Sequence, residues 1–182
     1  MTYWLRFLLT VSKAFFQKKI KWDEEIVQHF RVWFTEADMG IMNNARYFNF
    51  TELSKMRHFV GMGLFFTMIK LKWQPIASIQ TIRYKRALKR FEKFSLRSKL
   101  IYWDDKYIFQ HYIFEKNEKL IASAIVKACF LGPNGILHTD AVFKVLGVEN
   151  PPPPPPMPKA VADMYSIEKE LLTMPILETH AV

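Results

Sequence analysis

The sequence has little cysteine, little glycine and no long uninterrupted apolar run. Its 182 residues include a single cysteine, Cys129, which excludes an internal disulfide framework and a cysteine zinc cluster and is consistent with a reducing compartment. The five histidines show no ligand spacing, so neither a metal nor a redox cofactor is expected. No segment approaches the roughly 20 uncharged apolar residues that cross a bilayer, which excludes a polytopic membrane protein.

What the chain does have is a large apolar fraction and an excess of positive charge. Half of its residues are hydrophobic and 15% are aromatic, which excludes a disordered chain and, at this length, predicts one globular domain. Twenty-six lysines and arginines oppose 17 acids, for a net charge of +9, so the natural partners are nucleic acid, phospholipid or a phosphorylated small molecule. We do not expect nucleic acid, because no zinc finger, helix-turn-helix or ribonucleoprotein motif accompanies the charge.

The first 21 residues combine cations with aromatic and aliphatic side chains and contain no acid. This composition predicts a basic amphipathic helix within residues 1–28. Two orientations remain open, because such a helix can dock on its own domain or lie on an anionic membrane surface. A cleaved signal peptide is not favoured, since Lys13 interrupts the apolar run. The protein is therefore expected in the cytoplasm, with peripheral membrane contact through the N-terminus as an alternative. The cations are Arg6, Lys13, Lys18, Lys19 and Lys21.

A strand and a long helix are expected next. Residues 30–34 form a short apolar and aromatic run that predicts a strand, and an irregular stretch follows it. Asn43 or Asn44 can then cap a helix, because an asparagine side chain accepts hydrogen bonds from the free amides of a first turn. The helix is expected to end at Gly61 or the next glycine. Glu52 falls within an apolar stripe on this helix, where an ionisable group is costly unless it is paired or functional. The other residues of the stripe are Phe48, Met56, Phe59, Val60 and Gly63.

Beyond the helix the pattern alternates, which predicts antiparallel strands separated by short turns. These strands and the long helix predict an α+β domain over residues 29–148. Residues 149–182 form an appended segment, in which six prolines at 151–156 predict a polyproline II rod of about 19 Å that leads to a helix over Lys159–Leu172. A ligand for a proline-binding module is the alternative for the prolines. The expected strands are Ile76–Tyr84, Phe94–Trp103, Tyr107–Phe114 and Leu120–Leu131.

The stretch from Arg31 to Tyr47 carries the residues best suited to chemistry. Glu36 and Asp38 stand at the mouth of the predicted strand, before a glycine and the start of the helix. A helix N-terminus presents free amides that can polarise a carbonyl group or hold an oxyanion. A carboxylate beside it can activate water or act as a nucleophile, which is the combination that acyl transfer needs. The alternative for Asp38 is a purely structural role in the turn before the helix.

This stretch resembles the signature of the hotdog-fold acyl-CoA thioesterases of the 4-hydroxybenzoyl-CoA type. That signature contains an aspartate-x-aspartate, a short glycine-containing loop, a histidine-methionine-asparagine-asparagine-x-arginine-tyrosine segment and an acidic residue on the helix. The resemblance covers about residues 30–147. Glu36 replaces the first aspartate, Ile41 replaces the histidine, and the loop is one residue shorter. The matching residues are Arg31-Val32, Glu36-Ala37-Asp38, Met42–Tyr47 and Glu52.

The resemblance implies a hotdog fold, in which an antiparallel sheet wraps around the central helix. It also implies a homodimer or higher oligomer with acyl-CoA at the subunit interface and no cofactor. In this interpretation Asp38 acts as general base or nucleophile, the helix start around Asn43 and Asn44 polarises the thioester carbonyl, and Glu52 orients water. Pairing with a cation of the same helix, such as Lys55, is the structural alternative for Glu52.

Arg83, Lys85 and Arg86 begin a run of cations that extends to Lys99. Coenzyme A carries phosphate groups, so some of these side chains can bind it through charge-assisted contacts, and a solvated strand edge is the alternative. The sequence therefore predicts an enzyme that hydrolyses an acyl-CoA thioester to free acid and CoA. The alternative is a noncatalytic acyl-CoA or lipid-binding hotdog protein at a membrane surface, which Ile41 favours. Dehydration of a hydroxyacyl thioester is disfavoured, because that chemistry usually needs an imidazole base.

Overall fold

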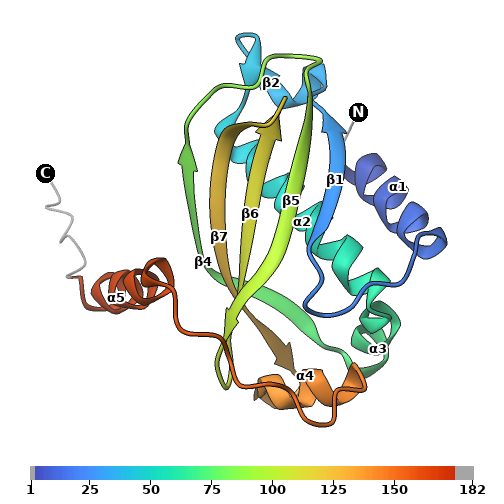
Figure 1. Cartoon of the computed structure of the whole chain (residues 1–182), viewed down its shortest axis with the longest axis vertical. Helices are drawn as coiled ribbons and strands as arrows, with labels where there is room; N and C mark the ends of the chain where they lie inside the picture. The colour runs from blue at the N-terminus through green and yellow to red at the C-terminus, as the bar shows by residue number, and fades with distance from the viewer. Residues whose placement is uncertain (1–2, 175–182) are drawn as a thin grey trace, which may run out of the picture.

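The computed structural model describes residues 3–174 (Figure 1). A helix and a strand precede a small hairpin, and a long central helix then leads into the main strands. The helices are α1 (Tyr3–Phe16), α2 (Asn44–Gly61), α3 (Leu64–Leu71), α4 (Thr139–Val145) and α5 (Lys159–Thr173). The strands are β1 (Ile26–Arg31), β2 (Ala37–Asp38), β3 (Ile41–Met42), β4 (Gln74–Tyr84), β5 (Lys93–Trp103), β6 (Ile108–Lys116), β7 (Lys119–Gly132) and β8 (Gly135–Ile136). A short 3-10 helix over Phe34–Glu36 connects β1 to β2.

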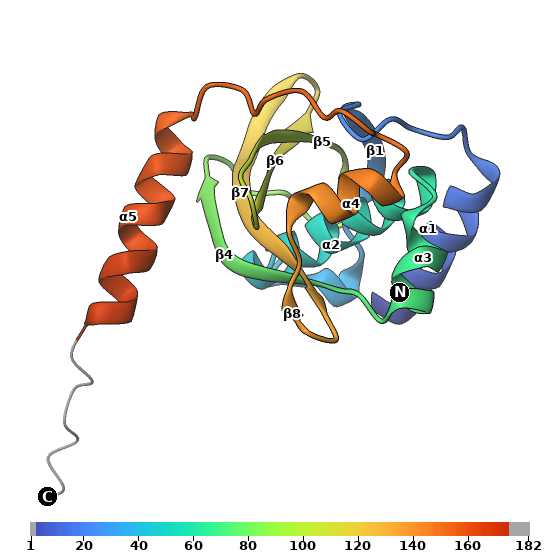
Figure 2. The same ribbon diagram turned by 90° about the horizontal axis from the view of Figure 1, so that it is seen from below.

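The main sheet is antiparallel, with the strand order β1-β5-β6-β7-β4 and with β8 paired to the end of β7. The register shifts between Ala77 and Ile79 in β4 and between Leu100 and Tyr102 in β5, and such irregularities bend strands. The sheet curls around α2, as the view from below shows (Figure 2). This arrangement confirms the predicted α+β hotdog fold. The four expected strands correspond to β4, β5, β6 and β7, with ends shifted by two residues or fewer.

The hydrophobic core lies between the concave face of the sheet and α2. In β5, Phe94 and Leu96 point inward and are at most 3% exposed. The Phe94 ring packs edge-on against Phe50 of α2, with 5.0 Å between ring centres, and Tyr47 packs in the same way against Phe114 of β6. Full burial of each such side chain stabilises the fold by about 1.5–3 kcal/mol. The alternation of the strands and the length of α2 therefore specify the same core.

The N-terminal helix α1 packs against α2, on the side of α2 that the sheet leaves open (Figure 1). This confirms that the helix docks on its own domain. Because α1 and the sheet cover different sides of α2, the middle of α2 is buried nearly all round, including the polar side chains of Ser54, Arg57 and His58. Of the apolar stripe expected around Glu52, Phe59 and Val60 are buried, whereas Phe48, Glu52 and Met56 are only partly buried. The stripe therefore lies in the core only toward the end of α2.

Three local expectations differ from the structure. Strand β1 begins at Ile26 and ends at Arg31, four residues earlier than expected at its start, because Gln28 and His29 interrupt the apolar pattern without interrupting the pairing with β5. The helices α3 and α4 were not expected at all. Both are eight residues long or shorter, which is too short for a helical period to stand out.

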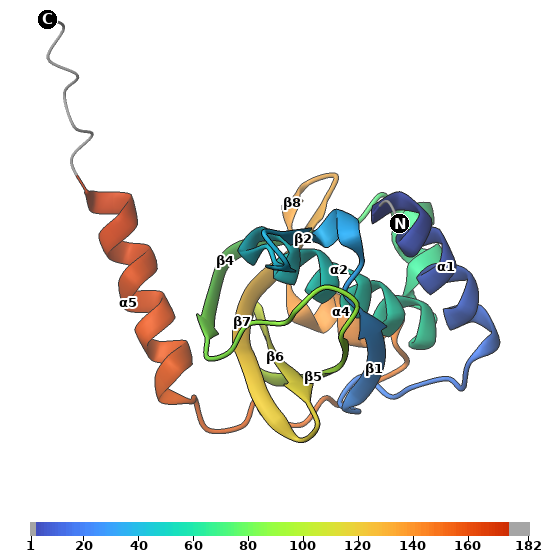
Figure 3. The same cartoon turned by 90° about the horizontal axis from the view of Figure 1, so that it is seen from above.

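The C-terminal part follows its expected course. The proline run connects α4 to α5, whose bounds agree with the predicted helix to within one residue. Helix α5 lies on the convex face of the sheet, at the side of the molecule away from α1 (Figure 3). Its Val161 and Met164 are at most 2% exposed, and its Glu168 accepts a 2.5 Å hydrogen bond from the buried Lys127 of β7. No helix among residues 3–174 combines the length and the apolar character needed to cross a membrane.

Candidate active site

Asp38 lies in a small hairpin formed by β2 and β3. The strands pair Ala37 with Met42 and Asp38 with Ile41, and Met39 and Gly40 form the turn between them. Gly40 has a φ of 87°, a left-handed conformation that glycine adopts without the steric penalty of a side chain. The hairpin ends at Met42, and only the cap residue Asn43 separates it from α2, which begins at Asn44. The fold therefore places the Asp38 carboxylate beside the N-terminus of the central helix.

Asn43 joins this carboxylate to the helix. Its side-chain oxygen accepts a 2.8 Å hydrogen bond from the Ala45 amide and so caps α2, while its side-chain nitrogen donates to Asp38 Oδ2. One asparagine thus serves as the predicted cap and also orients the carboxylate. The structure brings Asp38 and Asn43 together as the sequence predicts.

The free amide at the helix start belongs to Asn44. The Asn43 amide donates to the Glu36 carbonyl oxygen at 2.9 Å, and the Arg46 amide donates to the Asn43 carbonyl oxygen at 3.0 Å. Because the Ala45 amide is used by the cap, only the Asn44 amide of this turn has no acceptor within residues 3–174. A helix N-terminus with one unused amide is a donor for a developing oxyanion. The Asn44 amide is therefore the donor at the helix start that remains available to a ligand.

Glu36 holds the hairpin to α1 through a buried ion pair. The Arg6 guanidinium lies 2.9 Å from the Glu36 carboxylate, donates to the Arg31 carbonyl oxygen at 3.1 Å and lies 5.0 Å from the centre of the Phe50 ring. The Glu36 carboxylate also accepts from the Trp33 amide at 2.8 Å. Burial lowers the pKa of Arg6, and the charge of Glu36 opposes this shift. No local sequence pattern predicts this contact, because 30 residues separate its two partners.

The basic loop between β4 and β5 runs along the same hairpin. The Met42 amide donates to the Leu88 carbonyl oxygen at 2.7 Å, and the Arg90 amide donates to the Gly40 carbonyl oxygen at 3.0 Å. At the end of β4, the Tyr84 hydroxyl donates to the Asn44 carbonyl oxygen at 3.1 Å. These contacts fix the cationic loop at the same end of the molecule as Asp38.

The predicted CoA-binding residues divide into two groups. Arg83 and Lys85 are exposed and line a concavity of about 270 Å³ together with Leu120 and Ser123. Arg86 is also exposed, but its guanidinium donates to the Leu120 carbonyl oxygen at 2.7 Å. Two of the three cations therefore have side chains that border open space near the hairpin.

Glu52 lies apart from the Asp38 hairpin within one chain. Its carboxylate is 2.5 Å from the ammonium group of Lys55, which is the pairing that the sequence analysis left open. Glu52 stands eight residues after Asn44, or about 12 Å along the helix axis. A single chain therefore does not bring Glu52 to Asp38.

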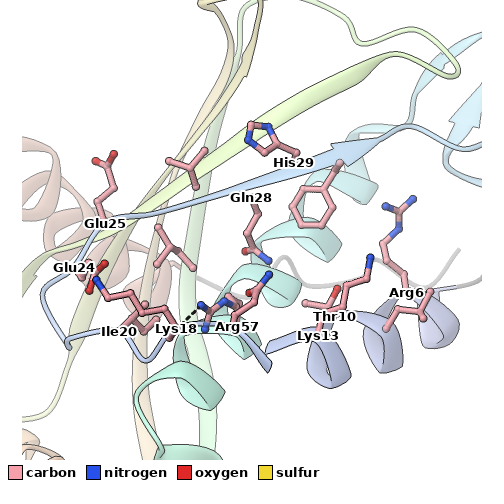
Figure 4. Close-up of a pocket in the computed structure, with 15 residues that line it drawn as sticks. Arg6, Thr10, Lys13, Lys18, Ile20, Glu24, Glu25, Gln28, His29 and Arg57 are labelled. Atoms are coloured by element: carbon pink, nitrogen blue, oxygen red, sulfur yellow. Dashed lines mark hydrogen bonds between the residues drawn. The ribbon is translucent and has the colours of Figure 1, made fainter. Parts of the chain in front are cut away.

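The Asp38 site is open to solvent in one chain. Asp38 is exposed to solvent. A groove of about 610 Å³ lies elsewhere, between α1 and β1 (Figure 4). There the buried Arg57 donates to the Lys18 carbonyl oxygen at 3.0 Å, and its Nη1 has no hydrogen-bond partner within the described residues.

A curled antiparallel sheet around one long helix, with a carboxylate hairpin at the start of that helix, defines a hotdog-fold protein. A model of the thioesterase-like superfamily matches residues 32–164, which is most of the chain. The protein belongs to the thioesterase-like superfamily.

Curated relatives include proteins with the name Protein THEM6. The sequence is 33% identical over 129 residues to the one from Danio rerio and 32% identical over 114 residues to the one from Xenopus laevis. These matches cover 68% and 60% of this chain but only 63% and 55% of the relatives, so they span less than two thirds of the relatives' length.

Solved structures share the fold at lower identity. A gentisyl-coenzyme A thioesterase superposes with a TM-score of 0.60 at 21% identity, and the match covers 66% of this chain and 98% of that structure. The DHNA-CoA thioesterase from Staphylococcus aureus gives a TM-score of 0.62 at 13% identity, covering 84% and 99%. A 4-hydroxybenzoyl CoA thioesterase variant in complex with 4-hydroxybenzoyl CoA gives 0.60 at 14% identity, covering 67% and 97%. At these identities the similarity establishes the fold alone.

Proposed function

We propose that the protein hydrolyses an acyl-CoA thioester at Asp38. The observation that carries the proposal is the double role of Asn43, which caps α2 and hydrogen-bonds the Asp38 carboxylate beside the unused Asn44 amide. A base and an oxyanion donor are the two groups that thioester hydrolysis needs close together. Membership of the thioesterase-like superfamily supports this assignment.

In the proposed reaction the Asp38 carboxylate removes a proton from water as the water oxygen attacks the thioester carbonyl carbon. The Asn44 amide donates to the oxyanion that forms, and Asn43 holds the carboxylate in place. Collapse of the tetrahedral intermediate breaks the carbon–sulfur bond, and Asp38 returns its proton to the leaving CoA thiolate. The products are a free acid and CoA, and the carboxylate is regenerated.

The open site leads us to place the substrate between two copies of the chain. The outer edge of β4 has no strand paired to it in the six-stranded sheet, and a long unpaired edge is a template for a second chain. Phe48, Glu52 and Met56 form a partly exposed stripe on α2 that a second copy could cover. In such a homodimer, Glu52 orients water at the Asp38 of the partner. Glu52 then acts across the interface, although it lies far from Asp38 in its own chain.

Arg83 and Lys85 are the residues that we assign to the phosphate groups of CoA. They border an open concavity, and their loop is hydrogen-bonded to the Asp38 hairpin. Arg86 has a supporting role, since it donates to the main chain at Leu120. The proposal includes a reducing, cytoplasmic setting, which agrees with the single buried free thiol of Cys129.

The test is release of free CoA thiol from a panel of acyl-CoAs that differ in chain length and aromatic character. We expect Asp38→Asn to lower the turnover rate by about 10²-fold or more. Asp163→Asn, which removes an exposed carboxylate on α5, is the matched control and should leave the rate unchanged. Equal rates for wild type and Asp38→Asn would remove Asp38 from the mechanism.

A noncatalytic acyl-CoA-binding role is the second candidate, and Ile41 favours it. Ile41 occupies the position where the resembling enzymes carry histidine, and it is exposed directly across the hairpin from Asp38. Without an imidazole, one contact that could position the substrate is missing. Binding of acyl-CoA by titration calorimetry, without thiol release for any acyl chain, would establish this second role. Recovery of thiol release by Ile41→His would then show that the missing imidazole is what prevents turnover.

A further inference from the structure

The outer face of α1 is more apolar than the face that packs against the domain. At 100° per residue, the side chains on one continuous half of the helix are exposed, and they include Trp4 at 70%, Leu8 at 60% and Phe16 at 91% exposed. The opposite half, which faces α2, contains the buried Arg6 and Ala14. A helix whose only task is to cover a core has the reverse distribution. The remaining apolar side chains of the outer half are Leu5, Leu9 and Phe15.

Helix α3 extends this apolar face. The Phe15 ring lies 5.3 Å from the Phe66 ring and 6.0 Å from the Phe65 ring, so the end of α1 and the start of α3 are in direct contact. Phe66 is 65% exposed and Ile69 is 63% exposed. Figures 1 and 2 show α1 and α3 side by side, at the side of the molecule opposite α5. We call the exposed apolar side chains of these two helices the α1–α3 surface.

The charges carried by the same two segments are all positive. Residues 3–21 and 64–72 contain no aspartate or glutamate. Their exposed cations are Lys13, Lys18, Lys19, Lys21, Lys70 and Lys72. Apolar side chains flanked by lysines and free of acids are complementary to a membrane interface, where acyl chains lie beneath anionic headgroups.

We propose that the α1–α3 surface binds the surface of an anionic phospholipid membrane, with α1 in the plane of the interface. Exposed apolar patches of this kind mark interaction sites in folded proteins. A second copy of the chain fits less well, because symmetric pairing of this surface would bring its lysines against those of the partner. The two helices act together, since the Phe15 contacts hold α3 beside α1. The proposal is independent of hydrolysis, because Asp38 lies on neither helix.

The test is sedimentation of the full chain with vesicles of phosphatidylcholine alone or mixed with phosphatidylserine. We expect binding to the mixed vesicles that weakens as salt is added. Phe16→Ser and Phe66→Ser should each lower the partition coefficient roughly tenfold, because full burial of a large apolar side chain corresponds to about one to two decades in an equilibrium constant. Leu172→Ser on α5, where the side chain is 83% exposed, is the matched control and should have no effect.

The electrostatic part has its own variants. Exchange of Lys18 and Lys19 for glutamate should lower binding by more than tenfold, since each lysine near an anionic surface contributes roughly a fivefold factor. Exchange of Lys106 and Lys144, which are exposed elsewhere, is the control for net charge. Trp4 adds a spectroscopic measurement, because its exposed indole should shift its emission to shorter wavelength on vesicle binding, and Trp4→Phe should abolish the shift.

Three outcomes would overturn the proposal. One is equal sedimentation of the wild type with and without vesicles. The second is binding that Phe16→Ser and Phe66→Ser leave unchanged. The third is self-association, measured by analytical ultracentrifugation, that Phe16→Ser abolishes in the absence of any vesicle binding, which would assign the surface to a second copy. All the substituted side chains are exposed, and thermal unfolding of each variant checks that the fold is kept.

Discussion

The buried pair of Arg6 and Glu36 offers a direct test of how α1 is held to the Asp38 hairpin. Arg6 is 6% exposed and Glu36 is 8% exposed, so neither charge has much access to water. Replacing Arg6 by methionine keeps most of the apolar stem but leaves the Glu36 carboxylate buried without its cation. Removing one partner of a buried pair costs about 3–5 kcal/mol of folding free energy. We therefore expect Arg6→Met to destabilise the protein by about that amount.

A double variant separates the interaction energy of the ion pair from the effect of changing each side chain alone. Removing both charges avoids an unpaired buried ion, and replacing a buried ion pair by neutral groups is often close to neutral. Arg6→Met combined with Glu36→Gln should therefore be more stable than the sum of the two single changes predicts, by about 2 kcal/mol or more. The Arg6 contacts to the Arg31 carbonyl oxygen and the Phe50 ring are lost in both the single and the double variant that carry methionine at this position, so their loss cancels in the comparison.

Urea unfolding of the wild type, the two single variants and the double variant gives the four free energies that the cycle needs. The exposed pair of Arg97 and Glu25, which are 2.8 Å apart, is the control. Its disruption by Arg97→Met should change the urea midpoint little, because water screens exposed charges. A cost below about 1 kcal/mol for Arg6→Met, or additive effects of the two changes, would refute the reasoning that this pair anchors the hairpin.

Three further predictions concern the core and the C-terminal helix. Burial lowers the pKa of His58 from 6.5 to about 4. Near pH 5 the unfolded chain therefore binds a proton that the folded chain excludes, and the free energy of unfolding should fall by about 2 kcal/mol between pH 7.5 and pH 5. Urea unfolding of wild type and His58→Gln at both pH values measures this fall, and an equal loss in both proteins would contradict it. Gly61→Ala should destabilise the protein by about 1–3 kcal/mol, since a Cβ there would lie 2.6 Å from the Ile20 side chain, and an unchanged melting temperature would argue against that close packing. Met164→Ala should destabilise the chain by about 2–5 kcal/mol if α5 unfolds together with the sheet, whereas faster amide exchange confined to α5 would show that α5 detaches on its own.

The sequence predicts β5 well because this strand has one apolar and one polar face. In β5, inward Phe94 and Leu96 alternate with Ser95 and Arg97, and only a strand places such residues on opposite sides. The start of β1 is less predictable, because this edge strand has polar residues at Gln28 and His29, and pairing with β5 rather than composition defines it. The stability of short helices such as α3 depends on tertiary packing, and a local sequence pattern does not contain that information.

The sequence predicts those parts of the candidate site whose contacts join residues close together in the chain. Asn43 stands five residues from Asp38, and its role as a cap follows from the chemistry of asparagine at a helix start. The engagement of the Asn43 amide by the Glu36 carbonyl could not be predicted, since it depends on the path of the loop. In the sequence, Arg6 is one of several cations in a basic helical segment. Its burial against Glu36 is a tertiary contact that no helical period reveals.

The position of Arg6 links the two proposals of function in structural terms. On its inner half, α1 reaches the Asp38 hairpin through the Arg6 and Glu36 pair, while its outer half carries Trp4 and Phe16. The pair joins α1 to the hairpin through a contact that has little access to water. A membrane that orients α1 would therefore also orient the hairpin and the start of α2. If both proposals hold, Arg6→Met should leave vesicle binding intact while it lowers thiol release, because it uncouples the helix from the hairpin without altering the outer half of α1.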